Sequence, residues 1–286
     1  MLQQLIRIAR PRHWIKNVFI VVPVPFAVAA GAELEVARFA AGLAGFCLLN
    51  SSVYAFNDIF DAEADRLNPN KRTRPVASGA LSRRAASVFS AALLVAGLAI
   101  CGASGGPTTL LLAGIYLGVN VAYTLGAKHV PLVDVFLLSS GFLIRILIGC
   151  ALVAATPSSW LLSCSTALAL FLSFAKRRAE LISIEGTGHR PALAGYTIQF
   201  LDQAMAICAG ITLLSYAIYS QEAAVFVAGR ELVGMPFVAF AILNYLRLAY
   251  TEGAGQSPVD VTLHSAALQL CAAGWAVATA WSLGWL

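Results

Sequence analysis

Charged side chains are scarce in this sequence. Asp, Glu, Lys and Arg make up only 12% of the 286 residues, whereas 59% of the residues are hydrophobic. The mean hydropathy is +0.78. A water-soluble chain of this length needs a far more polar surface, so the composition argues against a soluble protein and indicates an integral membrane protein.

The sequence also lacks the spacings expected of cysteine or histidine sites. Its six cysteines are scattered through apolar segments without a Cys-x-x-Cys or Cys/His pattern, and its four histidines are equally dispersed. Neither a disulfide framework nor a zinc site is predicted, and the cysteines are interpreted as small packing residues. With no linker and no low-complexity segment, we expect a single domain over residues 1–286.

Long apolar runs dominate the chain and predict an all-α bundle. About 17 to 25 apolar residues are enough to cross the ~30 Å hydrocarbon core of a bilayer. Nine such runs are predicted as transmembrane helices, at residues 14–31, 38–56, 85–101, 108–125, 132–155, 159–175, 204–220, 232–250 and 264–285. Pro23 and Pro25 are expected to kink the first. A small-residue stretch near its end imitates a signal-peptide cleavage site, but the run is long enough to span, so we expect no cleavage.

Basic residues gather in alternate loops, which predicts the orientation. They are Arg7, Arg10, Arg12, Lys16, Arg66, Lys71, Arg72, Arg74, Arg83, Arg84, Lys128, Lys176, Arg177, Arg178, Arg190 and Arg247. The opposite loops hold little more than Glu33, Glu35, Glu222, Glu231 and Arg230. Because Lys and Arg stay on the cytoplasmic side during insertion, the N-terminus is predicted inside and the C-terminus outside. The net charge of +5 then needs no nucleic-acid partner.

One charged stretch interrupts the apolar pattern, "NDIFDAEADRLNPNKRTRP", residues 57–75. Asn57, Asp61 and Asp65 are spaced i, i+4, i+8, and Asp58 precedes Asp61 by three, so all four can face one side of a helix. Carboxylates this close repel one another unless a cation lies among them. Oxygen ligands without His or Cys favour Mg²⁺, which often shares its coordination sphere with substrate phosphates. The predicted metal ligands are therefore Asn57, Asp58, Asp61 and Asp65.

Basic residues follow the acidic ones directly. Lys71, Arg72 and Arg74 can hold phosphate oxygens that the metal leaves free, because Arg offers a planar fork of donors and Lys a point charge. Taken alone, these cations fit an ordinary solvated cytoplasmic loop equally well. Combined with the acids, they predict a clamp for a metal-bound diphosphate.

The motifs resemble a known family, the UbiA superfamily of intramembrane prenyltransferases, over the whole chain. The resemblance rests on "RPRHWIKN" before the first predicted helix and on N-D-x-x-D-x-x-x-D after the second. "NDIFDAEADRLNPNKRTRPVASG", "YTLGAKHVPLVDVFLLSSGFLIRILIG" and "AKRRAEL" are most similar to its decaprenyl-phosphate phosphoribosyltransferase branch. Where aromatic-acceptor members carry a second Asp-rich motif, Tyr123, Lys128 and His129 are followed by Asp134 alone. One metal cluster and a phosphate-binding Lys128 are therefore expected.

The resemblance implies a UbiA-type fold and an Mg²⁺-dependent enzyme that moves a 5-phosphoribosyl group from phosphoribosyl pyrophosphate (PRPP) to a polyprenyl phosphate. The partners are then PRPP, the polyprenyl lipid and the bilayer, while assembly into a homo-oligomer stays open. The attacking phosphate is already an anion at neutral pH, so no general base is required. The implied substrate-binding residues are Lys16, Lys71, Arg72, Arg74, Tyr123, Lys128, Asp134, Lys176, Arg177, Glu180 and Tyr196, and the implied catalytic residues are Asp58, Asp61 and Arg145.

Several interpretations stay open. Arg145 shares a helix face with Asp134 and Gly141, and a charge within a membrane helix marks either a substrate contact or an acid's partner on another helix. The role of Arg178 is undefined, and Asp260 and His264 can satisfy each other at i, i+4. Two other functions compete: prenyl transfer from a diphosphate to an aromatic or other acceptor, and transport through the membrane.

Overall fold

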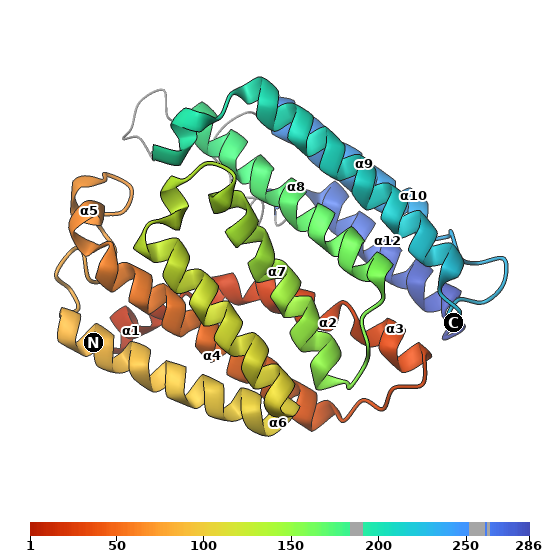
Figure 1. Cartoon of the computed structure of the whole chain (residues 1–286), viewed down its shortest axis with the longest axis horizontal. Helices are drawn as coiled ribbons and strands as arrows, with labels where there is room; N and C mark the ends of the chain where they lie inside the picture. The colour runs from red at the N-terminus through yellow and green to blue at the C-terminus, as the bar shows by residue number, and fades with distance from the viewer. Residues whose placement is uncertain (184–190, 252–260, 262–263) are drawn as a thin grey trace. The chain divides into compact units, whose positions relative to one another are not determined.

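The computed structural model describes residues 1–183, 191–251, 261 and 264–286. In this part of the chain every regular element is helical, as predicted (Figure 1). The elements are α1 (Leu2–Ala9), η1 (Pro11–Asn17), α2 (Val18–Val21), α3 (Val24–Ala29), α4 (Val36–Phe60), α5 (Ala62–Leu67), α6 (Arg83–Leu125), η2 (Ala127–His129), α7 (Val133–Leu152), α8 (Ser159–Ser183), η3 (Pro191–Gly195), α9 (Ile198–Glu222), α10 (Met235–Thr251) and α12 (Ala266–Ser282).

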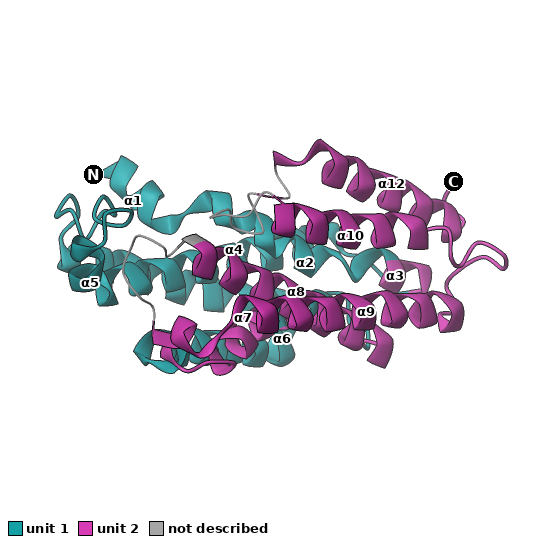
Figure 2. Cartoon of the chain, turned by 90° about the horizontal axis from the view of Figure 1, so that it is seen from above, with its two compact units in different colours: residues 1–25, 32–128, 144–156 teal, residues 26–31, 129–143, 157–286 magenta. Residues whose placement is uncertain are grey.

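The chain forms two compact units, coloured separately in Figure 2. Unit 1 comprises residues 1–25, 32–128 and 144–156, and unit 2 comprises residues 26–31, 129–143 and 157–286. Helix α7 contributes its first part to unit 2 and its remainder to unit 1. The prediction of one catalytic domain over residues 1–286 is not tested by this division.

Five helices of the described residues are long and apolar enough to cross a membrane, namely α4, α6, α7, α8 and α9. They contain the runs predicted at 38–56, 85–101, 108–125, 159–175 and 204–220, and α7 covers all but residue 132 and residues 153–155 of the run predicted at 132–155. The runs at 232–250 and 264–285 form the shorter helices α10 and α12. The count of nine spans and the orientation of the termini stay predictions.

The first predicted run differs from expectation. Residues 14–31 do not form one kinked helix but fall into three short segments, η1, α2 and α3. Pro23 precedes α3 and Pro25 lies within it, and neither has a backbone N–H to donate to a preceding turn. The two prolines therefore interrupt the helix where the apolar composition alone predicted continuity.

The core of unit 1 lies where α4 packs against α6. Phe46 and Leu49 of α4 and Cys101 of α6 are fully buried there. Small residues permit the close approach, because a Cβ on Gly97 would lie 2.8 Å from the carbonyl oxygen of Gly45. Such small-residue contacts let membrane helices approach backbone to backbone. This packing holds α4 in place and so positions its polar C-terminal turn, which contains Asn57 and Asp58.

Helix α6 bends sharply at Gly106, whose φ of 68° and ψ of −160° are not helical. Glycine reaches this conformation at no steric cost, and the following Pro107 lacks the N–H that would continue the helical ladder. Figure 1 shows the two arms, yellow and yellow-green, running in opposite directions. They correspond to the separate helices predicted at 85–101 and 108–125.

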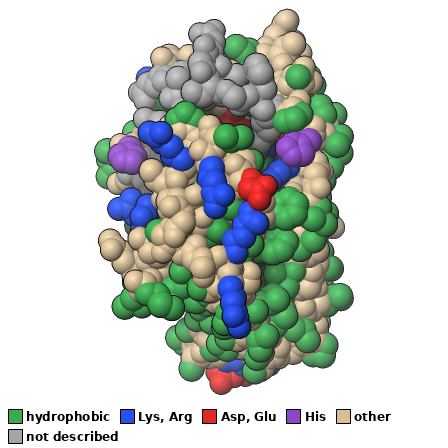
Figure 3. Space-filling model, turned by 90° about the vertical axis from the view of Figure 1, so that its left-hand side faces the viewer, with side chains coloured by type: hydrophobic (Ala, Val, Ile, Leu, Met, Phe, Trp, Pro, Cys, Tyr) green, Lys and Arg blue, Asp and Glu red, His purple; other side chains and the backbone are tan. Residues whose placement is uncertain are grey.

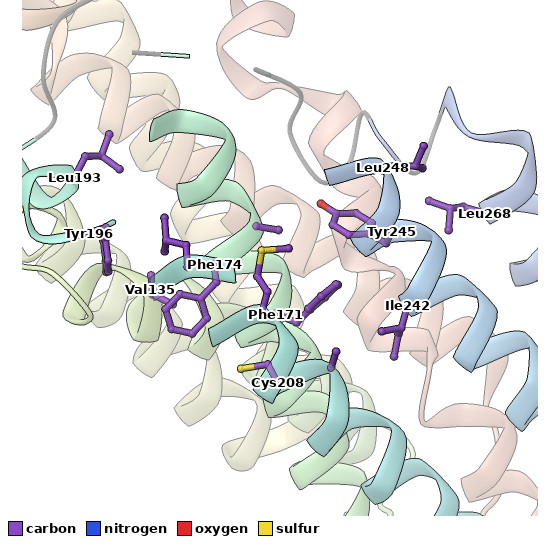
Figure 4. Packing of buried hydrophobic residues seen from close by; sticks show 14 residues of the cluster. Val135, Phe171, Phe174, Leu193, Tyr196, Cys208, Ile242, Tyr245, Leu248 and Leu268 are labelled. Carbon is purple, nitrogen blue, oxygen red and sulfur yellow. The ribbon is translucent and has the colours of Figure 1, made fainter. Parts of the chain in front are cut away.

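Unit 2 is built on α8, α9, α10 and α12. Figure 4 shows part of its buried cluster, with Phe171 of α8, Ile242 of α10 and Leu268 of α12 among the packed side chains. The rings of Phe171 and Tyr245 meet edge to face with centroids 5.3 Å apart. Helix α8 continues beyond the predicted end at residue 175 and reaches Ser183, so the basic "KRR" cluster is helical.

Arg178, whose role the sequence left undefined, joins three helices of unit 2. Its Nε donates to Asp202 Oδ1 of α9 at 2.5 Å, and its Nη1 donates to the carbonyl oxygen of Ala249 in α10 at 2.6 Å. The guanidinium also lies over the ring of Tyr250, 4.8 Å from the centroid. These contacts give Arg178 a role in holding α8, α9 and α10 together.

Candidate functional site

The acidic stretch of unit 1 is not one continuous helix, so the prediction of four side chains on one helix face is wrong. Helix α4 ends at Phe60, and α5 begins at Ala62, with Asp61 between them at φ −84° and ψ 1°. Asn57 and Asp58 therefore lie in the last turn of α4, and Asp65 lies in α5.

Asp58 and Asp65 are brought together by a shared arginine. Asp58 is 1% exposed and Asp65 is 3% exposed. Arg74 Nη1 lies 2.5 Å from Asp65 Oδ2 and 3.5 Å from Asp58 Oδ1. Arg10, from the N-terminal segment, also reaches Asp58 Oδ1, at 2.5 Å. The two buried carboxylates and two arginines thus form one continuous ion-pair network.

The other two predicted metal ligands contact the end of the second α6 arm and the turn that follows it. Asp61 Oδ1 lies 2.7 Å from Nζ of Lys128 in η2. Asn57 Oδ1 accepts a hydrogen bond from Thr124 Oγ1 at 2.5 Å. Lys128, for which phosphate binding was predicted, therefore lies next to Asp61, although the two residues are separated by more than sixty residues of sequence.

Lys71, another predicted ligand of unit 1, lies near this network. Lys71 Nζ lies 4.0 Å from Asp65 Oδ1. Lys16 and Tyr123 are half-buried, and Arg72 is exposed. On the face drawn in Figure 3, Lys and Arg side chains gather while acidic side chains are few. A surface of this charge attracts anionic substrates.

The donor set of the acidic stretch fits a hard divalent cation, although the carboxylates do not converge on one centre. Among the described residues no group of three or more His, Cys, Asp or Glu is close enough to hold a metal. Each carboxylate is met by a basic group instead. Within the same part of the chain, the buried Asp58 Oδ2 accepts no hydrogen bond. A buried oxygen in this state is costly without a partner, and a cation would supply one.

Arg145 of α7 lies in the interior of unit 1 and is 5% exposed. Its Nε donates to Asn17 Oδ1 at 2.8 Å, and its Nη2 lies 3.4 Å from Tyr116 Oη. The guanidinium also faces the rings of Phe46 and Tyr116, 5.3 and 5.2 Å from their centroids. Amide and aromatic groups therefore stabilise this charge.

Unit 2 contains a second acid–base cluster, and it is closed. Arg177 Nε lies 2.6 Å from Asp134 Oδ2, and both side chains are 0% exposed. Tyr196 donates its hydroxyl hydrogen to Asp134 Oδ1 at 2.6 Å and accepts from the backbone N–H of Leu132 at 2.6 Å. Burial and the hydrogen bond to Asp134 raise the pKa of Tyr196, which stays protonated at neutral pH.

Two further features belong to this cluster. Arg177 also pairs with Glu180 one turn later, and Lys176 Nζ lies 4.0 Å from Glu180 Oε1. Leu132, held by Tyr196, has a φ of 66°, which is uncommon for a residue with a branched side chain. The structure thus unites the predicted residues Asp134, Arg177, Glu180 and Tyr196 and uses them to hold one another.

Sequence reasoning missed several of these contacts. Arg10 was interpreted only as a charge flanking a membrane helix, yet it forms an ion pair with Asp58. Its place in "RPRHWIKN" was the available signal. Asn17, at the end of the same motif, was not singled out, although it contacts Arg145. Arg190 and Asp260 lie outside the described residues.

Comparison with known proteins agrees with this architecture. The chain matches the UbiA prenyltransferase family over residues 17–251. It is 32% identical to the decaprenyl-phosphate phosphoribosyltransferase of Corynebacterium glutamicum, covering 95% of this chain and 84% of the relative. It is 33% identical to the enzyme of the same name from Mycolicibacterium smegmatis, covering 95% of this chain and 89% of the relative.

Solved structures show the same fold. A UbiA homolog from Archaeoglobus fulgidus bound to DMAPP and Mg²⁺ superposes with a TM-score of 0.73 at 18% identity, covering 98% of each chain. The apo structure of a UbiA homolog from Aeropyrum pernix gives a TM-score of 0.69 at 21% identity, covering 94% of this chain and 98% of that one. With its five long apolar helices, this chain is a multi-pass membrane protein and belongs to the UbiA prenyltransferase family.

Proposed function

We propose that this protein transfers a 5-phosphoribosyl group from PRPP to a polyprenyl phosphate of the decaprenyl type, releasing pyrophosphate. The observation that carries the proposal is the identity of about one third with phosphoribosyltransferases over 95% of the chain. The product is a polyprenylphosphoryl-5-phosphoribose, which suits a precursor of arabinose-containing envelope glycans. The substrates then meet at the cytoplasmic face of the plasma membrane, where the basic loops are predicted to lie.

The acidic stretch is assigned to the metal. Asn57, Asp58, Asp61 and Asp65 would hold Mg²⁺, and the buried Asp58 Oδ2, which accepts no hydrogen bond from the described residues, supports this assignment. Bound there, Mg²⁺ supplies positive charge to the pyrophosphate leaving group.

The basic residues of unit 1 bind and orient the donor. When the ribose C1–O bond breaks, the electron pair leaves with pyrophosphate, and donors aimed at that group stabilise the developing charge. Arg74 and Lys128 already lie next to the carboxylates and are only partly exposed. Each can exchange its carboxylate for a phosphate oxygen with a small movement. A phosphate oxygen of the lipid then forms the new bond to C1, and no proton has to be removed first.

The remaining predicted residues have proposed supporting roles. Lys16, Lys71, Arg72, Tyr123 and Lys176 are assigned to substrate phosphates. Arg145 is assigned to the reacting centre as a catalytic residue. Asp134, Arg177, Glu180 and Tyr196 are assigned to the site as a set, and their mutual contacts favour a positioning role within unit 2.

A labelled-substrate assay on purified protein in detergent tests the proposal. One arm pairs radiolabelled PRPP with polyprenyl phosphate, and the other pairs polyprenyl diphosphate with an aromatic acid, each with Mg²⁺. Label passing from PRPP into the lipid phase, and lost when EDTA is added, is the expected result. Transfer in the second arm alone would replace phosphoribosyl transfer by prenyl transfer, and no transfer in either arm would favour a transporter.

A further inference from the structure

A basic pocket of unit 1 lies beside the acidic stretch and was not anticipated from the sequence. Its volume is about 210 Å³, and its lining includes Arg7, Arg10, His13, Asp58, Thr73 and Arg74. These residues come from three separate segments of the chain: the N-terminal segment, the end of α4 and the loop before α6. The pocket is therefore a product of the fold and not of one local motif.

Specific contacts hold the walls of the pocket in place. Arg7 Nη2 donates to the carbonyl oxygen of Thr73 at 3.2 Å and so ties the N-terminal segment to the loop. Arg10 reaches Asp58 Oδ1 and lies over the ring of Tyr54, 5.0 Å from its centroid. Its backbone adopts a left-handed conformation, with φ 51° and ψ 58°. An arginine where glycine or asparagine is favoured indicates that the side-chain contacts are retained at some cost to the backbone.

The charge of the pocket suits a phosphate monoester. Three arginines and one aspartate line the pocket, and because Arg74 also pairs with Asp65 outside the lining, at least one positive charge is left uncompensated when His13 is neutral. A phosphate monoester carries a charge of about −1.5 to −2 at pH 7. The Arg10 and Arg74 side chains are 22% and 26% exposed, so their remaining donors are accessible from the pocket. Guanidinium groups also match phosphate oxygens two at a time.

We propose that this pocket binds the 5-phosphate of the phosphoribosyl donor, an inference that rests on the proposed function. PRPP has two anionic ends, whereas a prenyl diphosphate has one. Asp61, Asp65, Lys71 and Lys128 are assigned to the pyrophosphate end of the donor and its metal, and Asp58, a proposed metal ligand, also lines the arginine pocket. Arg7 and Arg10 thereby select a phosphorylated sugar over a prenyl donor.

Titration calorimetry with ribose 5-phosphate and with pyrophosphate, each without metal, tests the pocket directly. Arg7→Gln is expected to weaken ribose 5-phosphate binding about tenfold, since it removes a charged hydrogen-bond donor. Pyrophosphate binding should change much less. Arg12→Gln is the matched control, because Arg12 is exposed on the same segment but does not line the pocket. If Arg7→Gln fails to fold, Arg10→Lys takes its place, because it keeps a cation next to Asp58 but loses the planar fork of donors.

Kinetics give a second measurement. Arg7→Gln should raise the KM for PRPP about tenfold, with kcat and the KM for polyprenyl phosphate nearly unchanged. The two experiments separate the two proposals. If wild-type protein binds ribose 5-phosphate and Arg7→Gln weakens it, the pocket stands even when no phosphoribosyl transfer is detected. If wild-type protein transfers phosphoribose but Arg7→Gln alters neither ribose 5-phosphate binding nor KM, the pocket assignment is wrong. Absence of ribose 5-phosphate binding at millimolar concentration overturns it as well.

Discussion

In unit 1 the buried Asp58 and Asp65 are met by arginines that stay partly exposed, at 22% for Arg10 and 26% for Arg74. In unit 2 the buried Asp134 is met by Arg177, and both side chains are fully buried. The two clusters have the same chemistry but different access to solvent. A cation that reaches solvent can exchange partners with an incoming anion, whereas a cation enclosed with its partner cannot do so without opening the core.

This difference in solvent exposure indicates different roles for the two clusters, although the sequence predicted residues of both as parts of one substrate site. The exposed cations of unit 1 favour ligand binding, and the closed pair of unit 2 favours a structural or positioning role. Breaking a buried pair by removing one partner is strongly destabilising, because it leaves a buried charge uncompensated. Activity should therefore respond first in unit 1, and stability first in unit 2.

The largest effect is expected from Asp58→Asn. The change removes the charge that both arginines contact and one proposed metal ligand, while keeping the shape of the side chain. Turnover of PRPP should fall about a thousandfold, roughly 4 kcal/mol in the barrier. The elution profile on size exclusion should not change. Glu63→Gln is the control, since Glu63 is a 78%-exposed acid of the same stretch and pairs with Arg83 at the surface. Turnover retained in Asp58→Asn would remove the metal assignment.

The second effect is expected from Asp134→Asn, and it should appear in stability. The substitution leaves the fully buried Arg177 with Glu180 as its remaining acidic partner among the contacts described above. We expect a loss of about 3 kcal/mol in the free energy of unfolding, measured by thermal or denaturant unfolding in detergent. Turnover per folded molecule should fall much less than in Asp58→Asn. The opposite result, intact stability with lost turnover, would make Asp134 a substrate ligand.

Arg145→Lys is expected to have an intermediate effect. Lysine keeps the charge but cannot donate to Asn17 with the same geometry or stack against Phe46 and Tyr116 in the same way. We expect kcat/KM for PRPP to fall about tenfold, since one charged hydrogen bond is worth roughly 1.5 to 3 kcal/mol, with expression retained. Loss of folded protein without a kinetic defect would give Arg145 a purely structural role.

The smallest effect is expected from Tyr196→Phe. The variant loses the hydrogen bond to Asp134 and the acceptor for Leu132, which should lower the unfolding midpoint by about 2 to 4 °C for each kcal/mol lost. The pKa of Tyr196 is raised in the folded state. Its neutral form therefore stabilises the fold fully below the unfolded pKa of about 10, and this contribution is lost as pH rises through the folded pKa. The difference in unfolding midpoint between wild type and variant should be constant from pH 6 to pH 9, because pH 9 is still about one unit below the pKa of tyrosine in the unfolded chain. A difference that varies within that range would assign the titration to another group.

Much of the fold could be predicted because membrane helices are encoded locally. Long apolar runs predicted α4, both arms of α6, α7, α8 and α9, since each run alone satisfies the length and hydropathy that the bilayer requires. The failures occur where other forces dominate. Pro23 and Pro25 interrupt the first run, and the chain breaks at Asp61 between α4 and α5. At that break the carboxylates are held by Arg74, near the end of the same stretch, and by Lys128 from beyond it, and not by helical spacing.

The candidate site was predictable only in part, for a related reason. Residue type and spacing identified Asp58, Asp61 and Asp65, because carboxylates this close together in sequence indicate a cation site. The partners of these acids come from distant segments, such as Arg10 for Asp58 and Lys128 for Asp61. No periodicity links residues so far apart in sequence, so their pairing becomes visible only in three dimensions.

The sharp bend at Gly106 sets a length scale for the site. Because the second arm of α6 begins at this bend, the number of residues between Gly106 and Thr124 determines how far Thr124 lies from the bend. With this number of residues, Thr124 contacts Asn57, and Lys128, which follows it, contacts Asp61. One inserted residue would advance the end of the arm by about 1.5 Å and rotate it by about 100°. Insertions or deletions within the second arm should therefore be tolerated far less than substitutions on its exposed side.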